Sequence, residues 1–340
     1  MLQILFSAVP FVVFAIGAVV STLFVATGLV TLLLVVAALY TEQQRRRIER
    51  DYPPRGRIVR AGDTDMHMLE RGKERGGRPV VLLHGAASNA DDMMASVGAA
   101  LADRHVIAID RPGHGYSDRP SPRDSSSPIV QARLVRQTLE AMGVRDAVVV
   151  GHSWGGCCAL TLALRDPHLV HGLLLLAPVT HPWRGKISWY WRVAANRWLG
   201  PLFVRTLVMP VGLASIRQTL RFAFAPNPVP DDYIEEAGIT RIFRPRNFAA
   251  NAEDMVDLWY NVNWLSSQYP RVTAPTVILQ GDSDGTLWPE LHAESLVRQM
   301  PNAKLRMLPG IGHLPNYFAQ GEIVTAVRDL ESGSAAVKVA

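Results

Sequence analysis

The chain has 340 residues, 48% of them hydrophobic, and a formal net charge of +5 at pH 7, which allows one large domain or two small ones. Its two cysteines, Cys157 and Cys158, are adjacent and cannot form an ordinary structural disulfide, so we expect no disulfide framework. The positive charge comes largely from one segment near the N-terminus, and no basic stripe interleaved with aromatic residues follows it. We therefore expect no nucleic-acid partner.

Residues 1–41 contain no charged side chain and are predicted to be a transmembrane anchor. As one helix they would be roughly 60 Å long, about twice the thickness of a bilayer's hydrocarbon core. A hairpin of two short spans, with a turn near Ser21 or Thr27–Gly28, fits this length better than one long tilted helix, which is the alternative. A cleaved signal peptide is disfavoured because the apolar run is too long and no Lys or Arg precedes it.

Residues 42–56 are predicted to be a basic juxtamembrane linker. Seven arginines and only three acidic residues lie between residues 41 and 60. By the positive-inside rule this flank stays in the cytoplasm, so we expect a membrane-anchored protein whose folded domain is cytoplasmic. The same arginines could also contact anionic lipid headgroups.

From residue 57 onward, buried strands alternate with amphipathic helices, which predicts a doubly wound, mostly parallel sheet. Two short strands surround a Gly62–Asp63 turn. The further strands are expected within 78–85, 105–110, 146–153, 171–178, 274–284 and 303–313, and the helices within 86–104, 127–143, 154–166, 288–300 and after 313.

This alternation stops between residues 181 and 269, where aromatic residues and arginines replace the buried strands. We expect this segment to be a helical lid inserted above the C-terminal ends of the sheet. The core then consists of residues 57–180 and 270–332, and residues 333–340 are expected to form a flexible tail.

The segment Gly151-His152-Ser153-Trp154-Gly155 stands between a predicted strand and a predicted helix. This G-x-S-x-G pattern is typical of a strained turn that exposes a serine hydroxyl above the sheet edge. Gly151 and Gly155 are needed because neighbouring backbone comes too close for side chains. The backbone N–H of Trp154, at the start of the helix, would point towards an oxyanion.

A serine nucleophile requires a base and a group that orients the base. In a sheet of this kind the chain order is serine, acid, histidine. Asp282 and Asp284 both follow a buried strand, and His313 lies in a loop after the last strand. His292 falls within a predicted helix, where a surface or capping role is the simpler interpretation.

The second oxyanion donor is expected in the loop after the strand at 78–85, where Gly85 lets the chain turn back and the backbone N–H of Ala86 is our candidate. His84 is interpreted as a structural brace of this loop. Asp110, at the end of another strand, is likewise assigned a structural role.

The segments "HGAASN", "DRPGHGYSDRP", "GHSWGG", "GDSD" and "GIGHLPN" resemble, in order and spacing, those of the α/β-hydrolase fold superfamily. The resemblance covers residues 57–332. It implies that the acid lies three residues after the glycine of the "G-x-x-D" turn, which favours Asp284 over Asp282. Epoxide hydrolases and haloalkane dehalogenases, which use an aspartate nucleophile, are disfavoured by Ser153. An acid after the preceding strand is excluded because "LLAPVT" has no carboxylate.

These features predict a serine esterase that works through Ser153, His313 and Asp284, with no cofactor and no metal. The alternatives are a cofactor-free perhydrolase (haloperoxidase), a carbon–carbon bond hydrolase on the same triad, and a non-catalytic membrane-bound scaffold.

Aromatic residues of the lid, above all Trp183, Trp189 and Trp259, are expected to bind the substrate by walling an apolar acyl pocket, although for any single one packing onto the core is the simpler interpretation. With the anchor, they favour a hydrophobic ester such as a monoacylglycerol or lysolipid. Membrane-anchored monoacylglycerol lipases of this fold are similar in layout.

Overall fold

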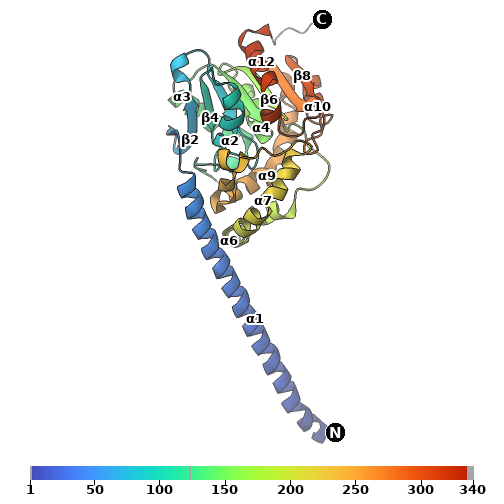
Figure 1. The fold of residues 1–340 in the computed structure, drawn as a ribbon. Coiled ribbons are helices and arrows are strands. Elements are labelled where there is room, and N and C mark those ends of the chain that lie inside the picture. Colours follow the sequence, from blue (N-terminus) through green and yellow to red (C-terminus); the bar gives the residue numbers. More distant parts are fainter. Residues whose placement is uncertain (1, 122–123, 335–340) are drawn as a thin grey trace.

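A computed structural model of the chain describes residues 2–121 and 124–334 (Figure 1). A long N-terminal helix, α1 (Leu2–Asp51), leads into a domain built around one eight-stranded sheet. Of the tail expected at residues 333–340, Gly333 and Ser334 follow the last helix, and the remaining residues lie outside the described part.

The sheet has the strand order β1-β2-β4-β3-β5-β6-β7-β8, with β1 and β2 antiparallel to their neighbours and all other pairs parallel. Leu83 pairs with Gly151, so the loops after β3 and β5 leave the same edge of the sheet. The strands are β1 (Arg57–Ala61), β2 (Thr64–Arg71), β3 (Val80–Leu83), β4 (Val106–Ile109), β5 (Ala147–His152), β6 (Val170–Leu176), β7 (Thr276–Gly281) and β8 (Ala303–Leu308).

Two apolar cores cover the two faces of the sheet, because successive strand residues point to opposite sides. In β5, Val149 packs towards α3 (Pro128–Ala141), α4 (Trp154–Arg165) and α10 (Ala293–Gln299). Its neighbours Val148 and Val150 pack towards α2 (Ala90–Met93) and α12 (Gln320–Glu331). Each fully buried aliphatic side chain stabilises the fold by about 1.5–3 kcal/mol.

Two helices begin later than the sequence pattern indicates. The helix expected from residue 86 begins at Ala90, because the side chain of Asn89 accepts a hydrogen bond from the backbone N–H of Asp92 and caps it. A short π-helical segment, Met94–Gly98, continues α2. The helix expected from residue 288 begins at Ala293.

The segment between β6 and β7 is an insertion of helices that lies beside the end of α1 in Figure 1. Its helices are α5 (Trp189–Ala194), α6 (Gly200–Thr206), α7 (Val208–Phe224), α8 (Tyr233–Glu236) and α9 (Pro245–Ser266), with a 3-10 turn at Ile239–Phe243. We call the whole segment 181–269, which contains these elements, the lid.

Helix α1 is continuous, so the hairpin favoured by the sequence is not formed and the alternative of one long helix holds. No residue near the expected turn interrupts the helix. The hydroxyls of Thr22 and Thr27 donate to the carbonyl oxygens of Ala18 and Leu23, which satisfies them within the helix. The stretch Ile16–Asp51 of α1 is long and apolar enough to cross a membrane, a property shared by signal sequences.

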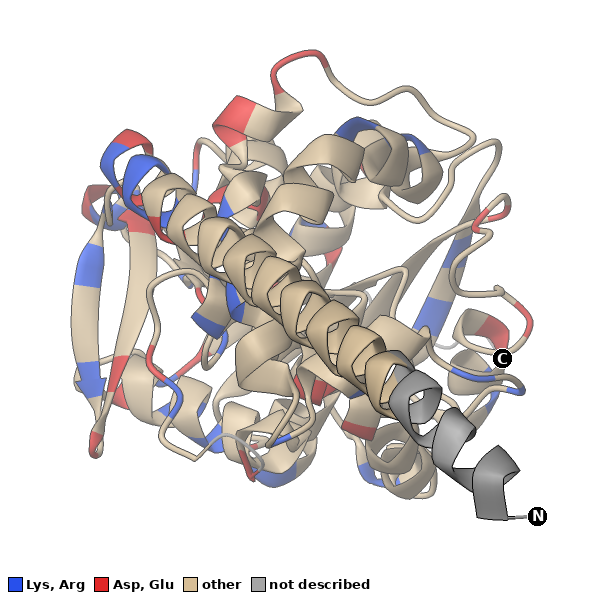
Figure 2. Ribbon diagram, turned by 90° about the horizontal axis from the view of Figure 1, so that it is seen from below, with Lys and Arg blue, Asp and Glu red and all other residues tan. Residues whose placement is uncertain are grey.

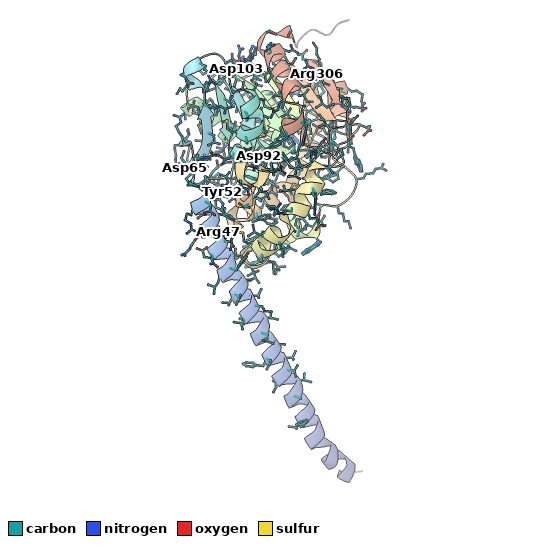
Figure 3. The ribbon with its side chains drawn as sticks, in the orientation of Figure 1. Arg47, Tyr52, Asp65, Asp92, Asp103 and Arg306 are labelled. Atoms are coloured by element: carbon teal, nitrogen blue, oxygen red, sulfur yellow. The ribbon has the colours of Figure 1, made fainter. Side chains whose placement is uncertain are left out.

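Residues 42–51, expected as part of a linker, continue α1. Ion pairs along the helix support this end, since Arg45 and Arg46 each lie 2.7 Å from Glu42. Figure 2 shows charged residues on α1 at this end, next to the domain, and Figure 3 shows the apolar part of α1 extending away from the domain, with side chains on all sides of the helix.

Candidate active site

Ser153 occupies a strained turn between β5 and α4, with a φ of 49° and a ψ of −115°. The turn needs glycine on both sides. A Cβ atom at Gly155 would collide with the carbonyl oxygens of Leu83 and His84, and one at Gly151 would lie 2.6 Å from the carbonyl oxygen of Gly155. The sharp turn places the serine hydroxyl at the carboxyl edge of the sheet, in the geometry described as a nucleophile elbow.

The structure brings Ser153, His313 and Asp284 together from three different loops. Nε2 of His313 lies 3.1 Å from Oγ of Ser153, and Nδ1 of the same ring lies 2.9 Å from Oδ2 of Asp284. Both distances are within hydrogen-bonding range. The histidine ring therefore connects the hydroxyl to the carboxylate.

Asp284 is buried and surrounded by donors. Burial alone would raise the pKa of its carboxyl, but the hydrogen bond and charge of His313, together with the backbone N–H groups of Leu287 and Thr286, outweigh burial and lower the pKa below its ordinary value. The amide of Gln280 also donates to Oδ2 at 3.0 Å. These contacts keep Asp284 ionised and fixed in orientation.

Asp282, the other candidate acid, has a different position. Its Oδ1 accepts hydrogen bonds from the backbone N–H of Gly310 and the hydroxyl of Ser283, both at 2.8 Å. It thus ties the end of β7 to the loop that carries His313 and makes no hydrogen bond with the histidine itself.

Ala86 and Trp154 carry the two backbone N–H groups expected from the sequence to face an oxyanion. Both residues line the same pocket as Ser153. Within residues 2–121 and 124–334, neither N–H group donates a hydrogen bond to a protein acceptor, whereas the next one, of Ala87, donates to Oδ1 of Asn251 in α9 at 2.7 Å. Ala86 and Trp154 are therefore available to a ligand.

The orientation of the Gly85–Ala86 peptide follows from its carbonyl group. The oxygen of Gly85 lies 2.8 Å from Nδ1 of His84 and accepts a hydrogen bond from Nη2 of Arg111 at 3.1 Å. In a trans peptide the N–H points opposite to the carbonyl, so the N–H of Ala86 is directed away from Arg111. Gly85 also approaches the turn so closely that a Cβ would lie 3.1 Å from Cβ of Ser153.

His84 and Asp110 hold neighbouring backbone through hydrogen bonds. Burial, followed by the charge of Arg111, lowers the pKa of His84 well below its ordinary value, so the ring is neutral and its Nε2 accepts the backbone N–H of Arg111 at 3.0 Å. Asp110 accepts the backbone N–H groups of Ala90 and Tyr116 at 2.7 and 2.9 Å.

A buried ion pair connects this loop to the lid. Nη1 of Arg111 lies 2.7 Å from Oδ2 of Asp254 in α9, and both side chains are fully buried. The guanidinium also contacts the oxyanion segments, since its Nε donates to the carbonyl oxygen of His84 at 2.9 Å and its carbon lies 4.1 Å from the ring centroid of Trp154. Arg111 was not among the site residues expected from the sequence.

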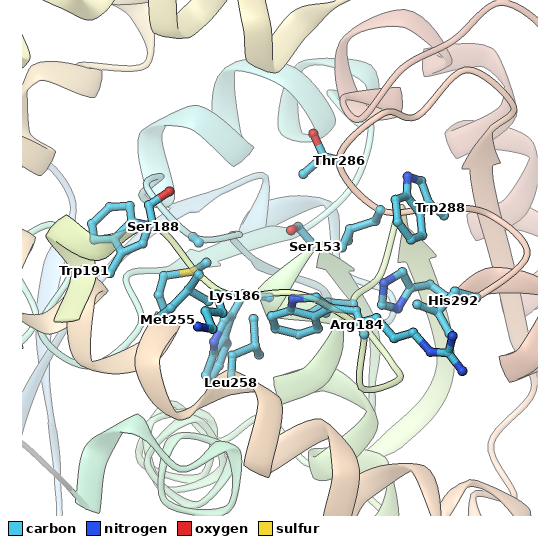
Figure 4. Close-up of a pocket in the computed structure, with 17 residues that line it drawn as sticks. Ser153, Arg184, Lys186, Ser188, Trp191, Met255, Leu258, Thr286, Trp288 and His292 are labelled. Atoms are coloured by element: carbon cyan, nitrogen blue, oxygen red, sulfur yellow. The ribbon is translucent and has the colours of Figure 1, made fainter.

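The pocket in front of Ser153 has a volume of about 360 Å³ and apolar walls (Figure 4). Most of its lining comes from the lid and from the loop after Asp284. The residues around Ser153 include Trp183, Arg184, Lys186, Ile187, Trp191, Met255, Leu258, Leu287, Trp288 and Leu291.

Of the three lid tryptophans expected in this pocket, only Trp183 lines it, which corrects the expectation for the other two. Trp189 is 68% exposed and contacts Phe203 instead. Successive side chains on a helix are about 100° apart, so Trp191, two positions along, faces the pocket when Trp189 does not. The indole N–H of Trp259 donates to the backbone oxygen of Trp183 at 3.0 Å.

Of the two roles expected for His292, surface or capping, the structure shows the second. His292 occupies the N-cap position of α10 and is buried, and its Nδ1 accepts the backbone N–H groups of Thr180 and His181 at 3.2 and 3.3 Å. It also lines the pocket, as does Trp288. Both follow Asp284 closely in the chain, and this proximity is the signal that could have identified them.

No cluster of three or more His, Cys, Asp or Glu side chains suited to a metal ion occurs among the described residues.

Comparisons with known proteins agree with the fold. A family model described as alpha/beta hydrolase fold matches residues 78–320. The chain is 25% identical over 279 residues to a 2-hydroxymuconate semialdehyde hydrolase of Pseudomonas putida, covering 77% of this chain and 88% of that protein. It is 32% identical to part of the polyketide synthase ThaQ of Burkholderia thailandensis, covering 70% of this chain but only 11% of that protein.

Among solved structures, the chain is similar in fold to a membrane phospholipase A described as a bacterial virulence factor. The two share 24% sequence identity with a TM-score of 0.65, and the match covers 93% of this chain and 98% of the other.

The buried pair of Arg111 and Asp254 yields a stability prediction. Asp254→Asn removes the charge that neutralises a fully buried guanidinium, and breaking such a pair costs about 3–5 kcal/mol. Glu322→Gln, the matched control, removes an exposed pair with Arg306 and should cost at most about 1 kcal/mol. Urea unfolding of the full chain in detergent measures both, and equal losses would contradict the structural role of Asp254.

A second prediction concerns the stability of the chain at acidic pH. Burial, then the charge of His181, lowers the pKa of His292 to about 4, whereas the unfolded chain binds this proton near pH 6.5. The unfolded state therefore takes up more protons as the pH falls from 6.5 to 4, and the free energy of unfolding decreases across this range.

The His292→Asn variant should show a smaller decrease in this range, because the amide oxygen can accept the same backbone N–H groups without titrating. The exposed His168→Asn should keep the wild-type dependence. If the free energy of unfolding of the two variants depended on pH in the same way, His292 would not be the group responsible for the decrease.

Proposed function

The chain belongs to the alpha/beta hydrolase fold family and is by that relationship a hydrolase; from this premise we propose that it is a serine hydrolase that cleaves carboxylic esters with hydrophobic acyl groups. The observation that carries the proposal is the connection from Oγ of Ser153 through the ring of His313 to Asp284. This arrangement has the geometry of a nucleophile, its base and the group that orients the base.

In the first half of the reaction, Nε2 of His313 accepts the hydroxyl proton as Oγ of Ser153 attacks the ester carbonyl. The tetrahedral intermediate collapses, the bond to the alcohol breaks, and the alcohol leaves with the proton from His313. Water then attacks the acyl-enzyme, with His313 again accepting a proton. The products are a carboxylic acid and the restored serine.

Two electrostatic features support this sequence of steps. Asp284, whose pKa is lowered, stays ionised, holds the proton on Nδ1 and stabilises the imidazolium. The N–H groups of Ala86 and Trp154 stabilise the oxyanion, and losing one such donor typically reduces turnover by about two to three orders of magnitude.

The hydrophobic substrate follows from the pocket and from α1. Trp183, Trp191 and Trp288 give the pocket aromatic walls, and its volume of about 360 Å³ suits an acyl chain. We propose α1 as a membrane anchor and the domain as cytoplasmic, because arginines flank the apolar run on the domain side. A monoacylglycerol or lysolipid would reach such an enzyme from the same membrane.

A carbon–carbon bond hydrolase is the second candidate. The relative from Pseudomonas putida is named for hydrolysis of 2-hydroxymuconate semialdehyde and matches 77% of this chain. The same serine, histidine and aspartate could serve that reaction, so the substrate decides between the two.

A fluorophosphonate probe tests the proposed nucleophile in the full chain. We expect covalent labelling of the wild type and none of Ser153→Ala. Asp284→Asn should lower esterase kcat by roughly four orders of magnitude, as expected when the orienting carboxylate is lost. Asp282→Asn, only two residues away, should retain most activity. Labelling of Ser153→Ala, or equal losses in the two aspartate variants, would refute the triad.

p-Nitrophenyl esters of graded chain length test the substrate class. The apolar pocket predicts a higher kcat/KM for acyl chains of about eight to twelve carbons than for acetate, because each buried methylene contributes about 0.8 kcal/mol. A far better rate with acetate would contradict a lipid-like substrate. Faster cleavage of a 2-hydroxy-6-oxo-dienoate than of any ester would favour the second candidate.

A further inference from the structure

The charged side chains in the first half of the lid are all basic. Between Asp166 and Asp231 the sequence contains seven Lys and Arg residues and neither Asp nor Glu. All seven basic side chains are exposed, and none of them forms an ion pair within the described part of the chain: Arg184, Lys186, Arg192, Arg197, Arg205, Arg217 and Arg221. This surface is strongly basic and has no acidic partner of its own.

Large apolar side chains are exposed on the same segment. Trp198 and Phe222 are each 76% exposed, and they lie before α6 and near the end of α7. We define the lid outer face as the exposed apolar residues Trp198, Leu199, Leu202, Leu207, Val211 and Phe222. Arginine beside exposed Trp, Leu and Phe is the composition of helices that lie in a membrane interface.

The position of this face relative to α1 indicates what covers it. Helix α1 contacts α6 and α7, and one stripe of α1 is partly covered from Leu34 to Thr41 and on to Ile48. Residues 34–40 still belong to the uncharged run that would enter a bilayer. The lid therefore lies alongside the last apolar turns of α1, at the depth where the helix would leave the hydrocarbon (Figure 1).

We propose that the lid outer face docks into the interface of the same bilayer that α1 enters, with the basic residues contacting anionic lipid headgroups. A second copy of this chain is a poorer occupant, because two faces with seven unpaired basic residues each would repel one another. Anionic lipids complement both the charge and the apolar side chains.

Docking has a consequence for the active site. Trp183, Ile187 and Trp191 belong to the same half of the lid and line the pocket of Ser153. The pocket is thus carried by a segment held at the membrane surface, which favours a substrate drawn from the bilayer. This consequence rests on the anchoring and ester hydrolysis proposed above, whereas the docking itself is measured without any substrate.

Single cysteines carrying the fluorophore NBD report contact with lipid in the full chain. The native thiols do not interfere, because burial raises the pKa of Cys158 to about 12 and raises that of Cys157 further. Leu202→Cys and Phe222→Cys place the label on the lid outer face. Val25→Cys places it on the exposed apolar part of α1, and Thr325→Cys on the exposed side of α12.

The labelled chains are placed in nanodiscs of phosphatidylglycerol and phosphatidylethanolamine that contain nitroxide-labelled lipid. We expect the nitroxide to quench the labels at residues 202 and 222 several-fold more strongly than the label at 325. Quenching at 25 confirms insertion of α1. Quenching at 202 and 222 no stronger than at 325 would overturn the proposal. If the labels at 202 and 222 were shielded from lipid and Leu202→Cys formed a disulfide between two chains, the occupant of the lid outer face would be a second copy and the proposal would be overturned.

Charge is tested with the pair Arg217→Gln and Arg221→Gln. In the Phe222→Cys background this pair should reduce quenching in anionic nanodiscs, whereas Arg298→Gln, an exposed arginine on α10, should not. Equal quenching of the Phe222→Cys label with and without the two arginine substitutions would overturn the role of the basic residues. Because no substrate is used, an enzyme that failed to react with fluorophosphonate could still show docking, so the two failures are distinguishable.

Discussion

A Cβ atom at Gly155 would collide with the carbonyl oxygens of Leu83 and His84, and this close approach fixes the serine turn against the loop after β3. Because α4 begins directly against the loop after β3, the backbone of Ser153 must adopt a positive φ to connect β5 to the helix. The strained turn brings the serine hydroxyl, the N–H of Trp154 and the N–H of Ala86 to one pocket. Burial of the apolar side chains of β3 and β5 offsets the energy of this strained backbone.

The oxyanion segments are held from behind by Arg111, which contacts the carbonyl groups of His84 and Gly85 and the ring of Trp154. Its buried charge is balanced by Asp254 from the lid. The lid is therefore joined to the backbone donors by an ion pair as well as by packing. Because α6 and α7 of the lid contact α1, the lid lies between the apolar helix and the residues around Ser153.

Local patterns in the sequence were sufficient for the strands, the serine turn and the order of the reacting residues. The alternation of buried strands and helices predicts the sheet because its central strands are covered on both faces, as Val148 and Val149 illustrate. The glycines around Ser153 reveal the turn because only glycine tolerates the approach of backbone. Family resemblance favoured Asp284 over Asp282, and in the structure only Asp284 contacts His313.

Sequence alone could not decide which lid residues face the pocket, because Trp189 and Trp191 are equivalent in composition and differ only in direction around a helix. It also could not reveal the contact of Arg111 with Asp254, which are far apart in the chain, or the burial of His292. The continuity of α1 past Ser21 and Thr27–Gly28 was also visible only in the structure. The sequence by itself determined the elements and the candidate nucleophile and base, because these follow from local periodicity, turn chemistry and chain order, and the choice of Asp284 as the acid followed from the family resemblance. The pocket, the buried ion pair and the position of the lid beside α1 were decided by tertiary structure, because they depend on packing between distant segments.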